Sequence, residues 1–241
     1  MQVLRSTSHS SAHNAALEEW LYRNPPAEPV LLFYRNSGSV LIGRNQNVRR
    51  EADVEWCDSH GVPIVRRISG GGAVYHDLGN LNYGFVVERS GYSPDKYVGI
   101  ALEALKSVGL TEARINEHHS IWCGEGKVSG SAFALGKAAL VHGCILVETD
   151  LEMLSAALNG DPTAESAGAA IDSVRVPVVN AKSLSPSIGI EELQNAILFQ
   201  TAALLGCELV SGDCDAIAET QEFGELERKY SSRSWNMEKR F

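Results

Sequence analysis

The residues with the clearest capacity for chemistry lie in the segment Arg66–Asp77, which reads RRISGGGAVYHD. Its three consecutive glycines, Gly70–Gly72, lack Cβ atoms and allow backbone N–H groups to approach a ligand closely. Such N–H groups form concavities that bind anions, and the two arginines before them can pair with phosphate or carboxylate oxygens. The segment predicts an anion site; the alternative is a mobile glycine loop beside two surface arginines.

A second segment, Gly126–Ala132, reads GKVSGSA and places Lys127 before a run of small residues. The ammonium group of such a lysine can stabilise charge on a phosphate or on an acyl carboxylate as it reacts. The alternative is a solvated lysine on a hairpin strand. Neither segment has the spacing of a P-loop or of a dinucleotide-binding GxGxxG loop.

Histidine and cysteine residues near these segments are weaker candidates. His142, followed by Gly143, stands alone at a predicted strand start, and His76 and its neighbour Asp77 would point to opposite faces of a strand. We therefore assign no acid–base dyad. An activated Cys144 would indicate acyl transfer through a thioester, but a small buried residue is the simpler interpretation.

The composition of the 241 residues is that of a globular protein, with 44% hydrophobic and 21% charged residues. The net charge of -9 argues against a general nucleic-acid-binding protein. Residues 1–147 carry 14 basic and 14 acidic groups, whereas residues 148–222 carry 2 basic and 13 acidic groups. We therefore expect any anion site within the first 147 residues.

The compartment predicted by the sequence is the cytoplasm. The polar start of the chain resembles neither a signal peptide nor a transit peptide, and no apolar run is long enough for a membrane span. An odd number of cysteines without a CxxC pair suggests neither a disulfide framework nor a zinc site. The five cysteines are Cys57, Cys123, Cys144, Cys207 and Cys214.

Apolar periodicity and capping residues predict helices separated by strands. The predicted helices cover 11–22, 48–56 with Gly61 closing the helix, 94–108, 151–158, 190–205 and 217–229, with a polar loop over 161–188. The predicted strands cover 30–34 and 40–42, joined as a hairpin, then 63–68, a half-buried strand over 81–87, 121–123, 127–134 and 142–148. This irregular order predicts an α+β fold with mixed or antiparallel β-sheets flanked by helices.

Together these segments resemble the lipoate–protein ligase A family, within the biotin/lipoate protein ligase superfamily. The resemblance rests on Asn14–Glu19, Ile42–Asn47, Arg66–Asn82, Gly126–Ala132, His142-Gly143, Asp150–Glu152 and Tyr230 through Trp235-Asn236. It implies a biotin/lipoate protein ligase-like catalytic domain over residues 1–241, without the family's C-terminal accessory domain.

The activity implied by the resemblance is ATP-dependent. Lipoate attacks ATP, accompanied by Mg²⁺, to form lipoyl-AMP, and the lipoyl group then passes to a lysine of an acceptor lipoyl domain. The acceptor would be a 2-oxoacid dehydrogenase subunit, a glycine-cleavage H-type carrier or a similar protein. Some single-domain members need a separately encoded accessory protein, and we extend that expectation to this chain. Neither nucleic acid nor a membrane is an expected partner.

The resemblance also implies roles for individual residues. Lys127 would be catalytic, bridging the adenylate phosphate and the acyl carbonyl. The ATP- and adenylate-binding set would be Arg67, Gly72, Ala73, Val74, Tyr75 and Lys127. The lipoyl-binding set would be Gly71, His76, Lys127, His142 and Gly143. Metal ligands are not assigned.

This chain departs from the family pattern at Glu117, where an aspartate usually follows the asparagine, and at Cys144. One alternative function is a lipoyl or octanoyl transferase that works without ATP through a cysteine. Cys123 matches none of the positions of that cysteine, which favours the ligase. A biotin–protein ligase and a non-enzymatic lipoyl-binding protein are further alternatives, and the choice between lipoate and octanoate stays open.

Overall fold

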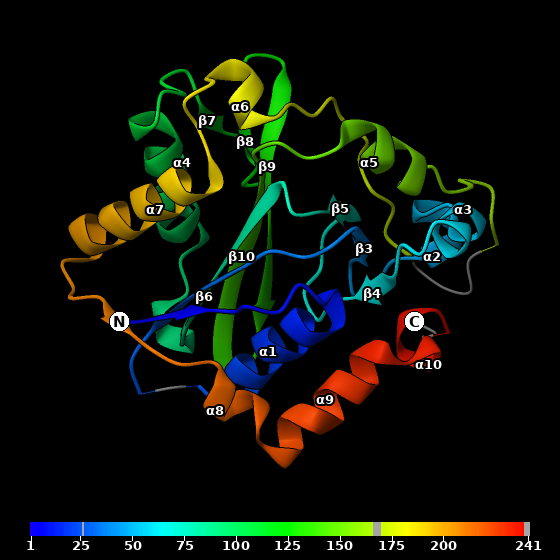
Figure 1. Cartoon of the computed structure of the whole chain (residues 1–241), viewed down its shortest axis with the longest axis horizontal. Helices are drawn as coiled ribbons and strands as arrows, with labels where there is room; N and C mark the ends of the chain where they lie inside the picture. Colours follow the sequence, from blue (N-terminus) through cyan, green and yellow to red (C-terminus); the bar gives the residue numbers. More distant parts are fainter. Residues whose placement is uncertain (26, 166–169, 239–241) are drawn as a thin grey trace.

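The computed structural model of the protein describes residues 1–25, 27–165 and 170–238, and its strands form two sheets flanked by helices (Figure 1). The larger sheet has the order β11-β1-β2-β6-β10-β9-β8-β7 and the smaller one the order β4-β3-β5. The strands of the larger sheet are β11 (Val210–Ser211), β1 (Gln2–Arg5), β2 (Val30–Tyr34), β6 (Asn80–Glu88), β10 (Ala138–Leu146), β9 (Gly126–Leu135), β8 (Ile121–Cys123) and β7 (Arg114–Ile115). Those of the smaller sheet are β4 (Ile64–Arg66), β3 (Ser39–Ile42) and β5 (Val74–His76). Parallel and antiparallel pairs occur in both sheets, which confirms the predicted α+β class.

Helices cover both faces of the larger sheet. Helices α4 and α7 pack on one face and α1 and α9 on the other, while α2, α3 and α5 lie beside the smaller sheet (Figure 1). The helices are α1 (Ser11–Arg23), α2 (Val48–Glu51), α3 (Val54–Ser59), α4 (Pro94–Ser107), α5 (Leu151–Ala157), α6 (Ala181–Leu184), α7 (Ile190–Leu205), α8 (Asp215–Ala218), α9 (Gln221–Ser231) and α10 (Arg233–Asn236), with a 3₁₀ turn at Arg89–Gly91. Within the described ranges, no helix is long and apolar enough to cross a membrane.

Strand β6 lies at the centre of the larger sheet, between β2 and β10. Leu81, Tyr83 and Phe85 face the core under α4 and α7, as the predicted alternation requires. Its other face is also covered: Gly84 has no side chain, so Glu18 of α1 packs close to it, 3.2 Å from the position of a Cβ. The predicted half-buried strand is therefore wrong in burial, because helices cover both faces of the sheet.

The hairpin predicted between residues 30–34 and 40–42 does not form. Strand β2 pairs with β1 and β6 in the larger sheet, and β3 pairs with β4 and β5 in the smaller one. The connecting segment places Asn36 in the interior, where its Oδ1 accepts a hydrogen bond from Asn14. The chain thus crosses from one sheet to the other at a point where its local sequence suggests only a turn.

Two predicted helices are each divided in two. After α2, Ala52 has an extended backbone and the Asp53 side chain caps α3 by accepting a hydrogen bond from the Trp56 N–H. Between α8 and α9, the Thr220 side chain caps α9 by accepting from the Phe223 N–H. In both cases an N-cap residue within the apolar pattern begins a new helix.

Other predictions hold with small changes. Helix α7 ends at Leu205, followed by the left-handed Gly206, and Asp150 caps α5 through its side chain. Strand β10 begins at Ala138, so His142 lies within this strand and not at its start. The short helix α6 lies inside the predicted polar loop.

Arg66 attaches the C-terminal helices to β4. Its side chain is buried and donates hydrogen bonds to the carbonyl groups of Gly43, Arg44, Gln46, Trp235 and Asn236. In the main chain, its N–H donates to Asn236 Oδ1 at 3.0 Å and its carbonyl accepts from Trp235 Nε1 at 2.7 Å. The prediction that Arg66 pairs with anion oxygens is therefore wrong, because its guanidinium binds backbone carbonyls, and the alternative of a surface arginine is wrong as well, because Arg66 is buried.

Replacing Asn236 by alanine should weaken this attachment. The Asn236→Ala variant loses the hydrogen bonds with the Arg66 N–H and with the Tyr230 carbonyl, and both of those groups belong to buried contacts. We expect a decrease of about 1–3 kcal/mol in the free energy of unfolding, measured by urea denaturation. Ser234→Ala, on the exposed side of the same helix, is the control and should change it by less than about 0.5 kcal/mol. Equal effects of the two substitutions would contradict the role of Asn236.

Candidate functional site

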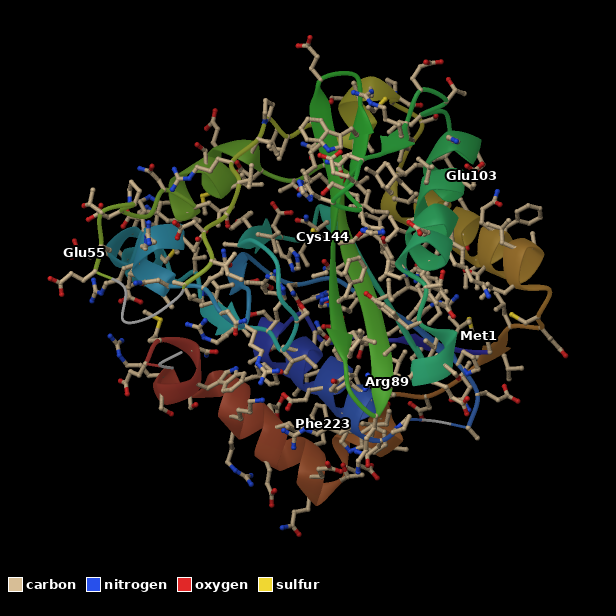
Figure 2. The ribbon with its side chains drawn as sticks, turned by 180° about the vertical axis from the view of Figure 1, so that it is seen from behind. Met1, Glu55, Arg89, Glu103, Cys144 and Phe223 are labelled. Atoms are coloured by element: carbon tan, nitrogen blue, oxygen red, sulfur yellow. The ribbon has the colours of Figure 1, made fainter. Side chains whose placement is uncertain are left out.

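A cavity of about 420 Å³ lies over the larger sheet and under the glycine loop. Its floor includes a row of paired residues on four adjacent strands: Gly130 on β9, Cys144 on β10, Asn82 on β6 and Tyr34 on β2. Figure 2 shows Cys144 of this row near the centre of the molecule. We refer to this space as the long cavity, because it extends across the strands from β9 toward β2.

A second cavity, of about 400 Å³, lies between β9, α5 and the segment 173–178. Ala73, Val74 and Tyr75 line it from the end of the glycine loop, and Leu151 and Leu154 line it from α5. We refer to it as the α5 cavity. The residues shared by the two cavities are Ala73, Val74, Lys127, Gly130, Cys144, Ser173, Val174 and Val176.

Lys127 therefore lies where the two cavities meet. Gly130 leaves room for its ammonium group, because a Cβ at that position would be 3.1 Å from Lys127 Nζ. Its backbone is held by the segment that lines the α5 cavity and by the residue after it: its N–H donates to Pro177 O, and its carbonyl accepts from the Val179 N–H. Burial lowers the pKa of Lys127, which Arg67 also lowers and Cys144 partly restores. Anionic groups brought to this point from either cavity would be next to a half-buried cation.

Arg67 shapes the glycine loop. Its guanidinium donates to the carbonyls of Gly70 and Gly72 at 2.7 Å each and to Leu41 O at 3.0 Å, while its Nε donates to Ser69 Oγ. Burial lowers the pKa of Arg67 to about 10, so the group is still a cation at neutral pH. Its charge faces the long cavity, but most of its N–H groups bind the protein's own oxygens.

The backbone N–H of Ala73, one of the donors expected to bind an anion, is bonded to a side chain. Ser173 Oγ accepts from the Ala73 N–H at 2.8 Å and from Gln46 Nε2 at 2.9 Å. The Ser173 N–H in turn donates to Glu51 Oε1 at 3.0 Å. A hydroxyl oxygen thus occupies the position at which the glycine loop would bind an anion.

His142 belongs to a buried chain of hydrogen bonds beneath the long cavity. Its Nδ1 donates to the Glu18 carboxylate at 2.8 Å, and its Nε2 accepts from Ser69 Oγ at 2.7 Å. Tyr34 OH donates to the same carboxylate at 3.1 Å, and burial, followed by the charge of Glu18, raises the pKa of Tyr34 well above 10.0. The ring of His142 is thereby fixed in one orientation and Tyr34 stays protonated.

His76 is held by a second buried chain. Asn14 Nδ2 donates to Asn36 Oδ1, and Asn36 Nδ2 contacts His76 Nδ1 at 3.1 Å. Burial lowers the pKa of His76 to about 3, with a contribution from the charge of Arg67, so this imidazole is neutral. The carboxylate of its neighbour Asp77 accepts instead from the N–H groups of Gly79 and Asp150.

Cys144 is the cysteine that lines both cavities. All five cysteines are free, and burial raises the pKa of Cys144, which Lys127 and Arg67 only partly lower. Cys123 is half-buried and lies outside the described linings of both cavities. These environments favour the interpretation of Cys144 as a small buried residue over that of a nucleophile.

The departure at Glu117 leaves its carboxylate in solvent. Asn116 lines the long cavity, and its Oδ1 accepts from the N–H groups of His118 and Ser120. The Glu117 side chain is 82% exposed and lies 3.7 Å from His118.

The structure brings the predicted site residues together around the two cavities. Gly71, Gly72, Arg67, His76, His142, Gly143 and Lys127 line the long cavity, and Ala73, Val74, Tyr75 and Lys127 line the α5 cavity. Sequence reasoning gave no role to Glu18, Tyr34, Asn82 or Ser173. A signal existed for Glu18, because an acidic residue four positions after Asn14 shares a helix face with it, near the apolar Leu21. Ser173, in a polar loop, had no such signal.

Comparison with known proteins identifies the group to which these features belong. Residues 10–202 match the family described as the lipoyl protein ligase A/B catalytic domain. Lipoate–protein ligase 1 of Staphylococcus aureus is 34% identical over 232 residues, covering 92% of this chain and 69% of the relative. A Schizosaccharomyces pombe protein that bears the name lipoate–protein ligase A is 41% identical over 174 residues, covering 71% of this chain. The match covers 47% of that relative, so this chain spans only about half of its length.

Solved structures show the same fold. LipL1 of P. falciparum in complex with lipoate superposes with a TM-score of 0.86 at 26% identity, covering 99% of this chain and 74% of that one. A lipoate–protein ligase A bound with ATP superposes with a TM-score of 0.79 at 29% identity, covering 98% of both chains. The predicted ligase-like fold is confirmed.

The neutral His76 should make stability depend on pH. Its pKa is lowered from 6.5 to about 3 in the folded protein, so below pH 6.5 the unfolded chain binds a proton that the folded one does not. The contribution of His76 is therefore complete above pH 6.5 and is lost as the pH falls. Between pH 7 and pH 5 we expect the wild type to lose about 2 kcal/mol more unfolding free energy than His76→Asn, which cannot titrate. Urea denaturation at both pH values checks this, and parallel pH profiles would contradict it.

Proposed function

Because this chain belongs to the lipoyl protein ligase A/B catalytic domain family, we propose that it is an ATP-dependent lipoate–protein ligase. The observation that carries this proposal is the position of Lys127, whose ammonium group lies where the long cavity and the α5 cavity meet. A reaction that joins a carboxylate to a nucleotide requires two binding spaces with a cation between them. This arrangement supplies both.

The long cavity is proposed to bind the lipoyl chain and the α5 cavity the adenosine of ATP. The carboxylate of lipoate and the α-phosphate would then meet at Lys127. Relatives support the two ligands, since LipL1 of P. falciparum was solved with lipoate and another ligase with ATP. Gly71, His76, His142 and Gly143 would line the acyl chain, and the loop Gly72–Tyr75 the nucleotide.

The reaction would proceed in two steps at this point. A carboxylate oxygen of lipoate attacks the α-phosphorus, the bond to the β-phosphate oxygen breaks, and pyrophosphate leaves. In the second step, the ε-amine of the acceptor lysine attacks the acyl carbonyl, AMP leaves, and the amine loses a proton to give an amide. Lys127 stabilises the negative charge in both steps, and its low exposure makes that interaction stronger than in water. Mg²⁺ would arrive as part of the Mg–ATP substrate.

Cysteine-dependent acyl transfer without ATP is the competing reaction, since Cys144 lines both cavities beside Lys127. The raised pKa of this thiol disfavours it, because the thiolate is the nucleophile in such transfers. Adenylation needs no thiolate. The two reactions also differ in their need for ATP, which makes them simple to separate.

The proposed acceptor is a lipoyl-domain protein, such as a 2-oxoacid dehydrogenase subunit or a glycine-cleavage H-type carrier. We also propose that residues 1–241 form one catalytic domain, whose activity requires a separately encoded accessory protein. Support for the last point comes from a bipartite archaeal lipoate–protein ligase of Thermoplasma acidophilum, which superposes with a TM-score of 0.76 at 28% identity. The proposed compartment is the cytoplasm, in keeping with five free thiols.

The proposal is tested by pyrophosphate exchange into ATP that depends on lipoate. We expect Lys127→Ala to lower kcat/KM by roughly 10²–10³-fold, the effect of removing one buried group that stabilises the reacting charge. Lys137→Ala, which removes an exposed lysine from the β9–β10 turn, is the matched control and should retain the wild-type value. Absence of exchange by the folded wild type, also with an accessory protein supplied, would refute the ligase; transfer of an acyl group without ATP would favour the transferase.

Ser173 should compete with the nucleotide. A phosphate oxygen can accept from the Ala73 N–H only after Ser173 Oγ has left it. Removing the hydroxyl in Ser173→Ala should therefore lower the Kd of ATP roughly two- to tenfold, the equivalent of one net hydrogen bond. Isothermal titration calorimetry measures this, with the exposed Ser183→Ala as the control. A higher Kd for Ser173→Ala would show that the hydroxyl assists nucleotide binding.

A further inference from the structure

Four residues that line the long cavity carry a buried polar atom with no hydrogen-bond partner among the described residues. Two of these atoms, Trp122 Nε1 and Ser131 Oγ, belong to half-buried residues, whereas the other two belong to residues that are almost fully buried. The latter two are Nε2 of His76, whose residue is 3% exposed, and Oδ1 of Asn82, whose residue is 1% exposed. Both residues line the long cavity. Buried polar groups are nearly always hydrogen-bonded in native proteins, so this pair indicates a place where a ligand supplies the partner.

The chemical character of His76 Nε2 follows from the chain of amides behind it. Asn14 Nδ2 donates to Ser8 O and to Asn36 Oδ1, which leaves Asn36 Nδ2 as the donor toward His76 Nδ1. The ring is neutral, since its pKa is lowered to about 3. With Nδ1 accepting, the single ring hydrogen is on Nε2, which is therefore a donor.

Asn82 provides the complementary group. Its Nδ2 donates to the Tyr34 carbonyl at 3.3 Å, which leaves Oδ1 as an acceptor. His76 and Asn82 thus contribute one donor and one acceptor to the cavity, and both are without a partner in the described protein. A ligand that offers one acceptor and one donor in this cavity would satisfy both.

The strand register gives the distance of this pair from the reacting centre. The ammonium group of Lys127 lies beside Gly130 on β9, and Asn82 is two strands further along the same row, beyond Cys144. Two strand spacings amount to about 10 Å. An eight-carbon acid whose carboxylate is at Lys127 therefore has the far part of its chain near Asn82.

We propose that His76 and Asn82 select acids that carry sulfur at the far end of the chain over acids that end in a methyl group. This inference rests on the proposed function. The alkyl end of octanoate leaves both buried groups without a partner, which costs binding free energy. A ring sulfur of lipoate accepts from His76 Nε2, while a thiol of dihydrolipoate accepts from His76 and also donates to Asn82 Oδ1. The order of preference is dihydrolipoate, then lipoate, then octanoate.

The test compares kcat/KM for the three acids in acid-dependent pyrophosphate exchange. Lipoate is assayed without reductant, dihydrolipoate anaerobically with a phosphine, and octanoate under both conditions, so that an effect of the reductant itself is visible. For the wild type we expect lipoate to exceed octanoate roughly tenfold, the effect of one unsatisfied buried group. Asn82→Leu should lower kcat/KM for dihydrolipoate to the value for lipoate, and should raise kcat/KM for octanoate toward that value.

His76→Asn is the second variant and decides the matter if Asn82→Leu does not fold. It keeps an acceptor for Asn36 but removes the Nε2 donor, so the ratio of lipoate to octanoate should fall by a similar factor. Thr201→Val removes a buried hydroxyl of α7, outside both cavities, and should leave all ratios unchanged.

The outcomes separate the two proposals. If the folded wild type activates none of the acids, also with an accessory protein supplied, the proposed function fails. The assignment of His76 and Asn82 is overturned, and the ligase stands, if the wild type has the same kcat/KM for octanoate as for lipoate. The same holds if both variants are active and keep the wild-type ratios of kcat/KM.

Discussion

Two consecutive arginines, each buried among backbone carbonyls, form the constraint on which the rest of this structure depends. A guanidinium group removed from water must be surrounded by acceptors, and Arg66 and Arg67 collect them from different parts of the chain. Because neighbouring residues of a strand point to opposite sides, Arg66 binds the C-terminal helices and Arg67 the glycine loop. The residue that attaches the C-terminal helices and the residue that shapes the glycine loop are therefore adjacent in the chain.

Charged side chains with few solvent contacts also occur at the cavities. Arg67 is a buried cation and Lys127 a half-buried one, and the Glu18 carboxylate, hydrogen-bonded to His142, is among the charges that act on Arg67. A nearby anion favours the charged form of a lysine, so binding an acyl carboxylate or a phosphate would raise the pKa of Lys127 that burial has lowered. The acidic excess of residues 148–222 lies outside the segments that supply these cations.

Much of the local structure was predictable because its causes are local. The ends of α5 and α7 follow from a capping aspartate and a glycine, each of which acts on the adjoining turn. The hairpin failed because a turn signal does not say which sheet receives the next strand; here the buried Asn36 makes its contacts with Asn14 and His76.

The residues of the site likewise divide into those that local sequence predicts and those that depend on the fold. Lys127 and the glycine loop were recognisable as motifs. The roles of Glu18 and Asn82 depend on partners brought together by the fold: Glu18 meets His142, 124 positions away, and Asn82 faces the cavity through its register with Cys144. No pattern within either local segment contains that information.

The hydrogen bonds between Arg66 and Asn236 have a consequence for biosynthesis. The two residues are 170 positions apart, and contacts of such separation close late in folding. Since synthesis proceeds from the N-terminus, the glycine loop is made long before the helices that brace the arginine at its base. A nascent chain would hold the complete set of motif residues without a finished pocket, and ligands that bind only the native state would begin to stabilise the protein after residue 236 has been added.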